Sequence, residues 1–278
     1  MEAAFFDLDK TVIARASVAA FGRPLYREGL ISRSTVARAL VTQFVYLHLG
    51  ASEDRLDRIR ESVLSLARGW DRDEVSRIVR QTLDDVIEPI IFAEALELIE
   101  RHRAAGRRVY LISASPAEIV DPLAEYLGAD GAVSSRAVVD ADNRYTGGMA
   151  FYCYGPYKAE AMRDLAMTER IDLAASYAYS DSYTDLPMLE VVGHPVAVNP
   201  DRVLGRLARE RGWPVAQFVH PVRLRDRMPV PNLSTAAVVA GTLVAASGTV
   251  MALRRHSHRS RAVAAVGLAS GLVARRLG

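Results

Sequence analysis

Three short apolar segments of this chain each end at a polar side chain that could take part in chemistry. The segments are residues 3–6, 109–112 and 177–180. Segments with helical apolar spacing lie between them, and this alternation predicts an α/β fold with a parallel sheet that helices cover on both faces. The carboxyl ends of parallel strands meet at one edge of such a sheet, where ligands bind. We therefore expect the residues at the three ends, Asp7, Ser113 and Asp181, to share a site.

A helical region separates the first strand from the second. Apolar residues recur there at spacings of three and four, and Gly50 and Gly69 interrupt the pattern. The spacing predicts an all-helical insertion, a cap, over residues 14–90. Its expected helices lie near residues 33–49, 53–68 and 71–87.

The core domain is expected to comprise residues 1–13 and 91–222, on either side of this cap. Asp142 and Asn143 mark the turn of a hairpin, because both residues favour turn conformations. The further expected elements of the core are a helix at 92–105, the hairpin at 133–152, a helix at 158–170 and a strand at 195–198.

Two motifs provide candidate reactive groups. Asp7 and Asp9 lie two residues apart where the chain leaves its first strand, so both could reach one pocket. One carboxylate could then attack while the other transfers protons. Ser113 precedes a helix that Pro116 opens, and the free N–H groups and dipole of a helix N-terminus favour a phosphate oxygen. Taken singly, the first motif is better explained by a polar turn, and an N-cap explains Ser113 equally well.

Two further motifs provide charge. Lys158 is one of two lysines in a chain with 33 arginines, and its compact ammonium would offset the repulsion between a carboxylate and a phosphate. Asp181 and Asp185 could hold a hard cation through their oxygens. A surface lysine and a capping aspartate are the ordinary alternatives. The fixed order of all four motifs, each at a strand end or helix start, favours a shared phosphate site.

This order of motifs resembles the haloacid dehalogenase superfamily, over about residues 3–201. The cap between the first two motifs and the hairpin before Lys158 look like the branch that includes phosphoserine phosphatase. Residues 151–155 and 181–189 look closer to the subfamily IB hydrolases, which include phosphatidylglycerophosphate phosphatases. The resemblance implies a Rossmann-like core and an Mg²⁺-dependent phosphomonoester hydrolase.

The resemblance also implies a role for each motif residue. Asp7 would attack phosphorus and form an aspartyl-phosphate, while Asp9 would protonate the leaving oxygen and then deprotonate the attacking water. The residues implied to bind phosphate are Thr11, Ser113 and Lys158. Mg²⁺ would be held by Asp7, the Asp9 carbonyl and Asp181, with Asp185 anchoring a metal-bound water.

One departure from phosphoserine phosphatases concerns the substrate. Those enzymes usually carry an acid nine residues after the nucleophile, which meets the substrate amine, but this chain has Ala16 there, beside Arg15. We therefore expect free phosphoserine to be a poor substrate, and Arg15 is a candidate for cap specificity. Two alternatives remain open: a soluble small-metabolite phosphatase, and a non-catalytic regulatory protein on the same scaffold.

The C-terminal part of the chain is basic and apolar. Residues 202–278 hold 13 arginines, no lysine and two acids, a net charge of +11 in a chain whose overall charge is +2. Residues 233–253 contain no charged side chain over 21 positions, which is long enough for a membrane-spanning helix. Two prolines mark a linker at 223–232. We expect residues 233–278 to form an apolar helical tail that spans a membrane or lies on its anionic inner face.

The expected location and partners follow from this tail. A single cysteine, Cys153, excludes an intrachain disulfide, and no segment like a signal peptide opens the chain. We expect a cytoplasmic catalytic domain that is attached to the inner face of the cell membrane. The expected partner is a phosphorylated small molecule or a lipid phosphate. The apolar residues around the tail arginines favour lipid over nucleic acid.

Overall fold

The computed structural model describes residues 1–31 and 64–220. The chain divides into two compact units, Met1–Leu224 and Arg225–Gly278, and the described residues all belong to the first. Among the described helices, none is both long and apolar enough to span a membrane. Several predictions concern segments outside the described residues: the helix at 33–49, most of the helix at 53–68, the linker at 223–232 and the tail at 233–278.

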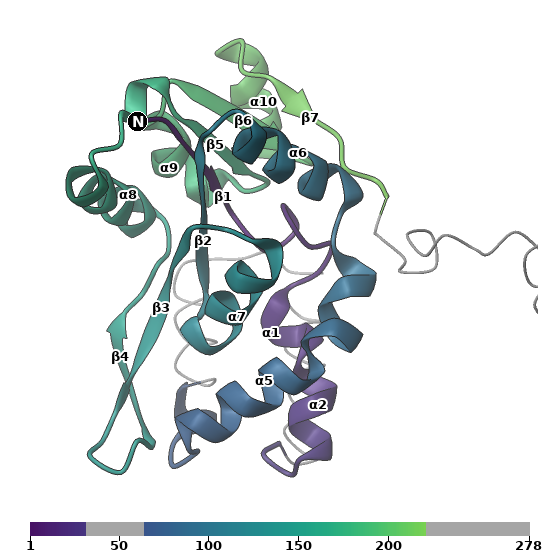
Figure 1. Ribbon diagram of the computed structural model, residues 1–278, viewed down its shortest axis with the longest axis vertical. Coiled ribbons are helices and arrows are strands. Elements are labelled where there is room, and N and C mark those ends of the chain that lie inside the picture. The colour runs from purple at the N-terminus through teal and green to yellow at the C-terminus, as the bar shows by residue number, and fades with distance from the viewer. Residues whose placement is uncertain (32–63, 221–278) are drawn as a thin grey trace, which may run out of the picture. The chain divides into compact units, whose positions relative to one another are not determined.

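A parallel sheet with one antiparallel edge strand is the centre of the first unit (Figure 1). Its strand order is β4-β3-β2-β1-β5-β6-β7. The strands are β1 Ala3–Phe6, β2 Arg108–Pro116, β3 Gly131–Val139, β4 Tyr145–Phe151, β5 Tyr177–Ser180, β6 His194–Val198 and β7 Val215–Ala216. Neighbouring strands run parallel except β3 and β4. The predicted α/β class with a parallel sheet is confirmed.

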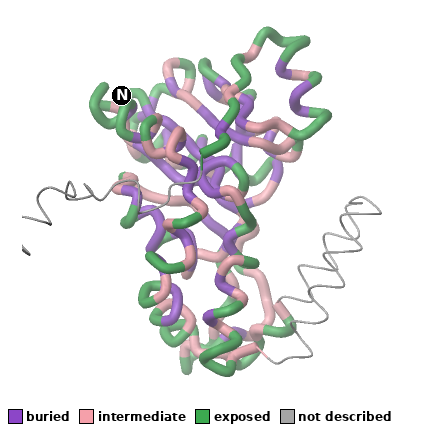
Figure 2. The backbone as a smooth tube through the Cα atoms, turned by 90° about the vertical axis from the view of Figure 1, so that its right-hand side faces the viewer, coloured by how far each residue is buried: buried purple, intermediate pink, exposed green. Residues whose placement is uncertain are grey.

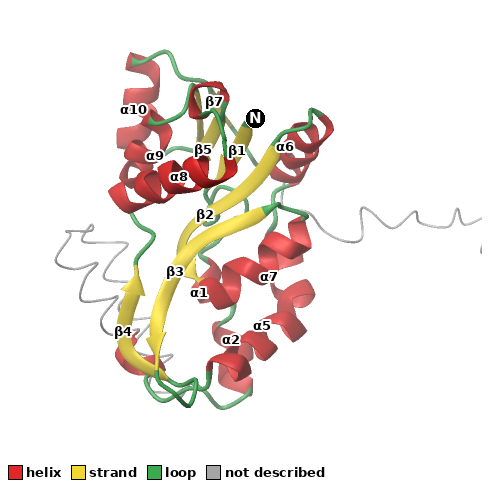
Figure 3. Ribbon diagram, turned by 60° about the vertical axis from the view of Figure 1, so that its left-hand side comes forward, coloured by secondary structure: helices red, strands yellow, loops and turns green. Residues whose placement is uncertain are grey.

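Helices cover both faces of this sheet (Figure 3). They are α1 Ser17–Ala20, α2 Gly22–Arg27, α5 Arg72–Ile87, α6 Ala93–Ala104, α7 Ala117–Leu127, α8 Pro156–Glu169, α9 Leu186–Glu190 and α10 Arg202–Glu210. The apolar residues of α5, α6 and α7 belong to the core on one face. Those of α8, α9 and α10 belong to the core on the other face.

Strand β1 explains why both faces need cover. Ala4 and Phe6 belong to the core on the α6 and α7 side, while Ala3 and Phe5 belong to the core on the α8 side. Side chains alternate along a strand, so an unbroken apolar run puts apolar surface on both faces. Each buried phenylalanine stabilises the fold by about 1.5–3 kcal/mol relative to an exposed one. Figure 2 shows buried residues concentrated in the interior of this unit, and all four residues of β1 are buried.

The helical region after β1 is confirmed where the structure describes it. The helix predicted at 71–87 is α5, and Asp71 caps its N-terminus by accepting hydrogen bonds from the N–H groups of Asp73 and Glu74. Val79 and Leu83 of α5 belong to the same apolar cluster as β1, and α5 packs against α7.

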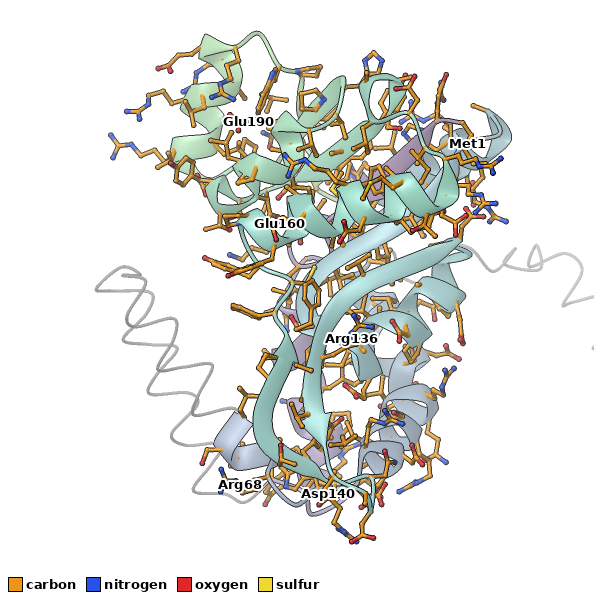
Figure 4. The ribbon with its side chains drawn as sticks, turned by 90° about the vertical axis from the view of Figure 1, so that its left-hand side faces the viewer. Met1, Arg68, Arg136, Asp140, Glu160 and Glu190 are labelled. Atoms are coloured by element: carbon orange, nitrogen blue, oxygen red, sulfur yellow. The ribbon has the colours of Figure 1, made fainter. Side chains whose placement is uncertain are left out.

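The predicted hairpin is also confirmed, as β3 and β4. Figure 4 shows it extending from the sheet to a turn at Asp140, close to Arg68 of the helical region. Main-chain bonds join the two segments, because the Gly69 N–H donates to Tyr145 O (2.8 Å) and the Tyr145 N–H donates to Trp70 O (3.0 Å). The hairpin therefore ties the segment just before α5 to the core.

Strand β2 differs from its predicted extent. The apolar run ends at residue 112, but the strand continues to Pro116 and pairs with β3 through Ser113 and Pro116, with a register shift between them. Small polar residues extend it because β3 offers partners. Helix α7 consequently begins at Ala117, with Pro116 as its N-cap, so Ser113 is not directly followed by a helix N-terminus. The sequence pattern also missed α10 and the two-residue strand β7.

Candidate active site

Asp7 lies where β1 leaves the sheet, between β2 and β5. Its N–H donates to Tyr179 O of β5 (2.9 Å), which continues the parallel pairing one residue beyond the strand. Its side chain is buried. Asp181 follows β5 and Ser113 lies near the end of β2, so the sheet brings all three predicted strand-end residues to one edge.

Lys158 joins Asp7 to Asp185 at this edge. Its Nζ atom donates to Asp7 Oδ1 (2.6 Å) and to Asp185 Oδ2 (2.7 Å), and all three side chains are buried. Lys158 comes from the first turn of α8, and Asp185 precedes α9. The hydroxyl of Ser180, the last residue of β5, also donates to Asp185 Oδ2 (2.7 Å). The four elements β1, β5, α8 and α9 thus meet in one charged cluster.

Burial and neighbouring charges act against each other in this cluster. Burial lowers the pKa of Lys158, but the carboxylates of Asp185 and Asp7 raise it more, so the ammonium stays protonated at neutral pH. Burial raises the pKa of Asp7 more than the Lys158 ammonium lowers it, and the charge of Asp185 raises it further. Two carboxylates therefore share one ammonium, and another cation would stabilise their charged forms.

Asp9 is held by two serines. Its Oδ1 atom accepts the N–H of Ser17 (2.8 Å), and its Oδ2 atom accepts the hydroxyl of Ser115 (3.2 Å). Burial raises the pKa of Asp9, while the hydrogen bonds from Ser17 and Ser115 lower it, and the net shift is upward. A carboxyl group with a raised pKa is suited to carry a proton at neutral pH.

The two hydroxyls predicted to bind phosphate are both buried. The oxygen of Ser113 accepts the N–H of Ser115 (3.1 Å), which leaves its own hydrogen to be donated elsewhere. Thr11 Oγ1 is enclosed and has no hydrogen-bond partner among the described residues. An unsatisfied buried hydroxyl costs about 1–3 kcal/mol, a cost that a ligand oxygen could relieve.

Asp181 is partly buried beside the cluster. Burial raises its pKa to about 6; the charge of Lys10 opposes the shift and that of Asp185 adds to it. The main-chain oxygen of Asp181 accepts the N–H of Asp201 (2.7 Å). Lys10 has a φ of 64°, and left-handed backbone at a residue other than glycine is often found at functional sites.

The chemistry of the donors fits Mg²⁺. The carboxylates of Asp7 and Asp181 and the carbonyl of Asp9 are hard oxygen ligands, and burial disfavours the charge of both carboxylates in the absence of a cation. Among the described residues, no group of three or more acidic, histidine or cysteine side chains is arranged to hold a metal. Mg²⁺ does not require such a group, because it commonly takes one or two carboxylates together with waters and substrate phosphate.

Three residues that contact this site were not predicted from the sequence: Ser17, Ser115 and Ser180. Ser115 could have been found, because it lies two residues after Ser113 and a strand would place both side chains on one face. Ser17 could not, because its hydroxyl contacts Ser115, which is 98 positions away.

Comparison with known proteins places the chain in a family. Residues 4–190 match the family described as haloacid dehalogenase-like hydrolase. The chain belongs to this family. Among its relatives, the "Inhibition of morphological differentiation protein" of Streptomyces azureus is 50% identical over 263 residues, which cover 94% of each chain. A probable phosphatase of Mycobacterium tuberculosis is 49% identical over 257 residues, 91% of this chain and 89% of that one.

A third relative, a phosphoserine phosphatase of Mycobacterium tuberculosis, is 35% identical over 92% of this chain and 81% of its own. Among solved structures, a protein of unknown function from Bordetella pertussis superposes with a TM-score of 0.68 at 26% identity, covering 77% of this chain and 97% of that one. A phosphoserine phosphatase structure with a phospho-aspartyl analogue has a TM-score of 0.56 at 19% identity, covering 81% and 96%, and shows the fold alone. The predicted resemblance is confirmed: this haloacid dehalogenase-like hydrolase is a phosphomonoester hydrolase.

Proposed function

We propose that the chain hydrolyses phosphate monoesters through a phosphorylated Asp7 and requires Mg²⁺. The observation that supports this best is the position of Lys158, whose ammonium lies 2.6 Å from the Asp7 carboxylate in a buried cluster. A carboxylate and a phosphate repel each other, and a fixed cation in a site of low dielectric offsets that repulsion where charge develops. Asp185 and Ser180 hold the ammonium and its partner in place.

The proposed reaction has two steps. Asp7 attacks phosphorus, the bond from phosphorus to the alcohol oxygen breaks, and Asp9 donates a proton to that oxygen. Asp9 then takes a proton from water, which attacks the aspartyl-phosphate and releases inorganic phosphate and free Asp7. The hydroxyls of Thr11 and Ser113 would donate to the phosphate oxygens. Mg²⁺, held by Asp7, the Asp9 carbonyl and Asp181, would supply positive charge beside the phosphate.

The substrate is proposed to bind between a cap and the core. We propose that residues 14–90 form the cap and that residues 1–13 and 91–222 form the core. In this arrangement Asp185 would anchor a water on the metal, beside its observed bond to Lys158. Arg15 and Ala16 are exposed next to Ser17, whose N–H contacts Asp9, so they lie close to the leaving-group side of the site.

A lipid phosphate is the substrate class that we propose first. The uncharged stretch at 233–253 and the arginines that follow it would keep the site near an anionic membrane surface, on its cytoplasmic side. Ala16 would give no counter-charge to a substrate amine. A small soluble phosphate ester is the second candidate, because a relative that is 35% identical is named a phosphoserine phosphatase.

The experiment measures phosphate release with Mg²⁺ from phosphatidylglycerophosphate, phosphatidic acid, phosphoserine and 4-nitrophenyl phosphate. The full chain is compared with Asp7→Asn, which keeps the size of the side chain and removes the nucleophile. Release that depends on Asp7 and favours a lipid supports both parts of the proposal. Equal turnover of phosphoserine and the lipids would overturn the lipid assignment, and release that survives Asp7→Asn would overturn the mechanism.

A further inference from the structure

We infer that Ser115 and Ser17 are positioning residues that orient the carboxyl group of Asp9 toward the leaving oxygen. The inference rests on the proposed function, in which Asp9 transfers the proton. It adds two residues that bind no phosphate and no metal in that proposal. Both serines are buried, at 5% and 0% exposure, so water cannot readily replace the hydrogen bonds that they make.

The side chains of Ser17, Ser115 and Asp9 form one hydrogen-bonded group. Ser17 Oγ lies 2.7 Å from Ser115 Oγ, and Ser115 Oγ donates to Asp9 Oδ2 (3.2 Å). A hydroxyl has a single hydrogen, and that of Ser115 is used on Asp9. The hydroxyl of Ser17 can then donate to Ser115 or to Asp9, whose pKa its side-chain hydrogen bond lowers.

The main chain completes the restraint. The N–H of Ser17 donates to Asp9 Oδ1 (2.8 Å), so each carboxyl oxygen of Asp9 accepts one hydrogen bond from a different group. Rotation of the carboxyl group would break both bonds. A proton on the free side of either oxygen is thereby kept at a constant orientation, which is the condition for efficient transfer to a bound substrate.

The two serines come from elements that frame the site. Ser17 is the first residue of α1, where the N–H has no acceptor within the helix and is free to bind Asp9. Ser115 lies in the part of β2 beyond the predicted strand, and its N–H donates to Ser113 Oγ (3.1 Å). Ser115 therefore contacts both the proposed proton donor and a proposed phosphate ligand, and Ser17 links them to the start of the helical region.

The test compares two esters of similar size with different leaving groups. 4-Nitrophenyl phosphate releases a stabilised phenolate that needs little protonation, whereas 4-nitrobenzyl phosphate releases an alcohol that needs a proton. The readout is kcat/KM, which covers the steps up to alcohol release and excludes the later attack of water. General acid catalysis contributes roughly 10²–10⁴-fold. We expect Ser115→Ala to lower kcat/KM about tenfold or more on the benzyl ester and less than about twofold on the phenyl ester.

Three further variants sharpen the result. Ser17→Ala removes the hydroxyl that contacts Ser115 and should act in the same direction by roughly threefold, while Ser115→Thr keeps a hydroxyl and should restore most of the benzyl activity. Ser176→Ala is the matched control: Ser176 is buried, accepts the Ala3 N–H (3.0 Å) and donates to Asp172 O (2.6 Å), with no contact to Asp9. Its ratio of benzyl to phenyl activity should equal that of the wild type.

The possible failures can be told apart. Equal losses on both esters, or a wild-type ratio in folded Ser115→Ala, would overturn the positioning role. If Ser115→Ala does not fold, as judged by circular dichroism, Ser17→Ala decides by the same ratio. Asp7→Asn should remove activity on both esters; if it does not, the proposed function fails, whatever the serine variants show.

Discussion

Lys158 and Asp185 are joined by a buried ion pair of 2.7 Å that fixes α8 against the segment before α9. Removing one partner of a buried ion pair costs about 3–5 kcal/mol, because the other charge stays buried without compensation. We expect Lys158→Met to lower the free energy of unfolding by about 3 kcal/mol at pH 8 and to reduce turnover at least about 100-fold. Urea unfolding and phosphate release measure the two effects.

The loss of stability in Lys158→Met should depend on pH. Burial already raises the pKa of Asp7, and the variant removes the ammonium that opposes this shift. A group whose folded-state pKa is raised stabilises the fold at low pH and loses that contribution as the pH rises. The folded wild type loses this proton at about pH 8 and the variant at a higher pH, so the variant should be closer to wild type at pH 7 than at pH 9.5. The control is Lys10→Met, at the exposed second lysine. Its free energy of unfolding should stay within about 0.5 kcal/mol of the wild-type value at both pH values.

Asp181 provides a test of the metal proposal. Burial raises its pKa to about 6, and a carboxyl group must lose its proton to bind Mg²⁺. The Mg²⁺ concentration for half-maximal activity should therefore rise as the pH falls below about 6, and Asp181→Asn should raise it at least about tenfold at pH 7.5, or about 1.4 kcal/mol.

The control for Asp181→Asn is Asp201→Asn. Asp201 caps α10 and accepts the N–H of Tyr183 (2.7 Å), and asparagine is an equally good N-cap. Titration of activity with Mg²⁺, after removal of metal by a chelator, compares the two variants. The same Mg²⁺ dependence in both would contradict a role for Asp181 as ligand.

The sequence predicted the sheet well because its central strands are short apolar runs. Residues 3–6 and 177–180 were predicted with the bounds that β1 and β5 have. The polar continuation of β2 from Ser113 to Pro116 was missed, since its strand conformation depends on pairing with β3 rather than on apolar pattern. Strand β7 has two residues, too few for any periodicity to show.

The charged groups of the candidate site were predictable for a similar reason. Asp7 and Asp181 follow directly after strands, and parallel strands bring such positions together. The supporting serines were not, because their partners are distant in sequence: Ser17 and Ser115 meet only once α1 packs against β2. The local sequence pattern predicts which element carries a side chain, while tertiary packing decides which group that side chain contacts.

Gly193 tests the close packing of the loop before β6. A Cβ atom at this position would lie 1.7 Å from the main-chain oxygen of Ala174, and a backbone atom cannot move aside as a side chain can. Overpacking of this kind costs about 1–3 kcal/mol or more. We expect Gly193→Ala to lower the free energy of unfolding by about 3 kcal/mol, measured by urea unfolding at pH 7.5.

Gly22→Ala is the matched control for this substitution. Gly22 is the first residue of α2, and no heavy atom lies within 4 Å of a Cβ built there. Alanine is favoured over glycine in helices by up to about 1 kcal/mol, so this variant should be neutral or slightly more stable. Similar stabilities for the two glycine variants would show that the Ala174 segment can shift away.

The environment of His102 predicts that the protein becomes less stable as the pH falls. Its Nε2 atom lies 2.7 Å from Tyr179 Oη, and its buried Nδ1 atom has no hydrogen-bond partner among the described residues. Protonation would place an unsatisfied N–H at Nδ1. Burial, with the charges of Arg107 and Arg101, lowers the pKa of His102 from 6.5 to about 4.

The sign of the effect follows from this shift. The unfolded chain binds a proton at His102 below about pH 6.5, and the folded protein does so only below about pH 4. The contribution of neutral His102 to the free energy of unfolding is therefore complete above about pH 6.5 and is lost as the pH falls toward about 4. The loss should reach about 2 kcal/mol at pH 5. His102→Phe should reduce the difference in unfolding free energy between pH 7 and pH 5 by that amount, even if the lost bond to Tyr179 lowers stability at both. His194→Gln, at an exposed histidine stacked on Tyr177, should keep the wild-type difference. If His102→Phe keeps the wild-type difference in unfolding free energy between pH 7 and pH 5, another group causes the loss of stability in acid.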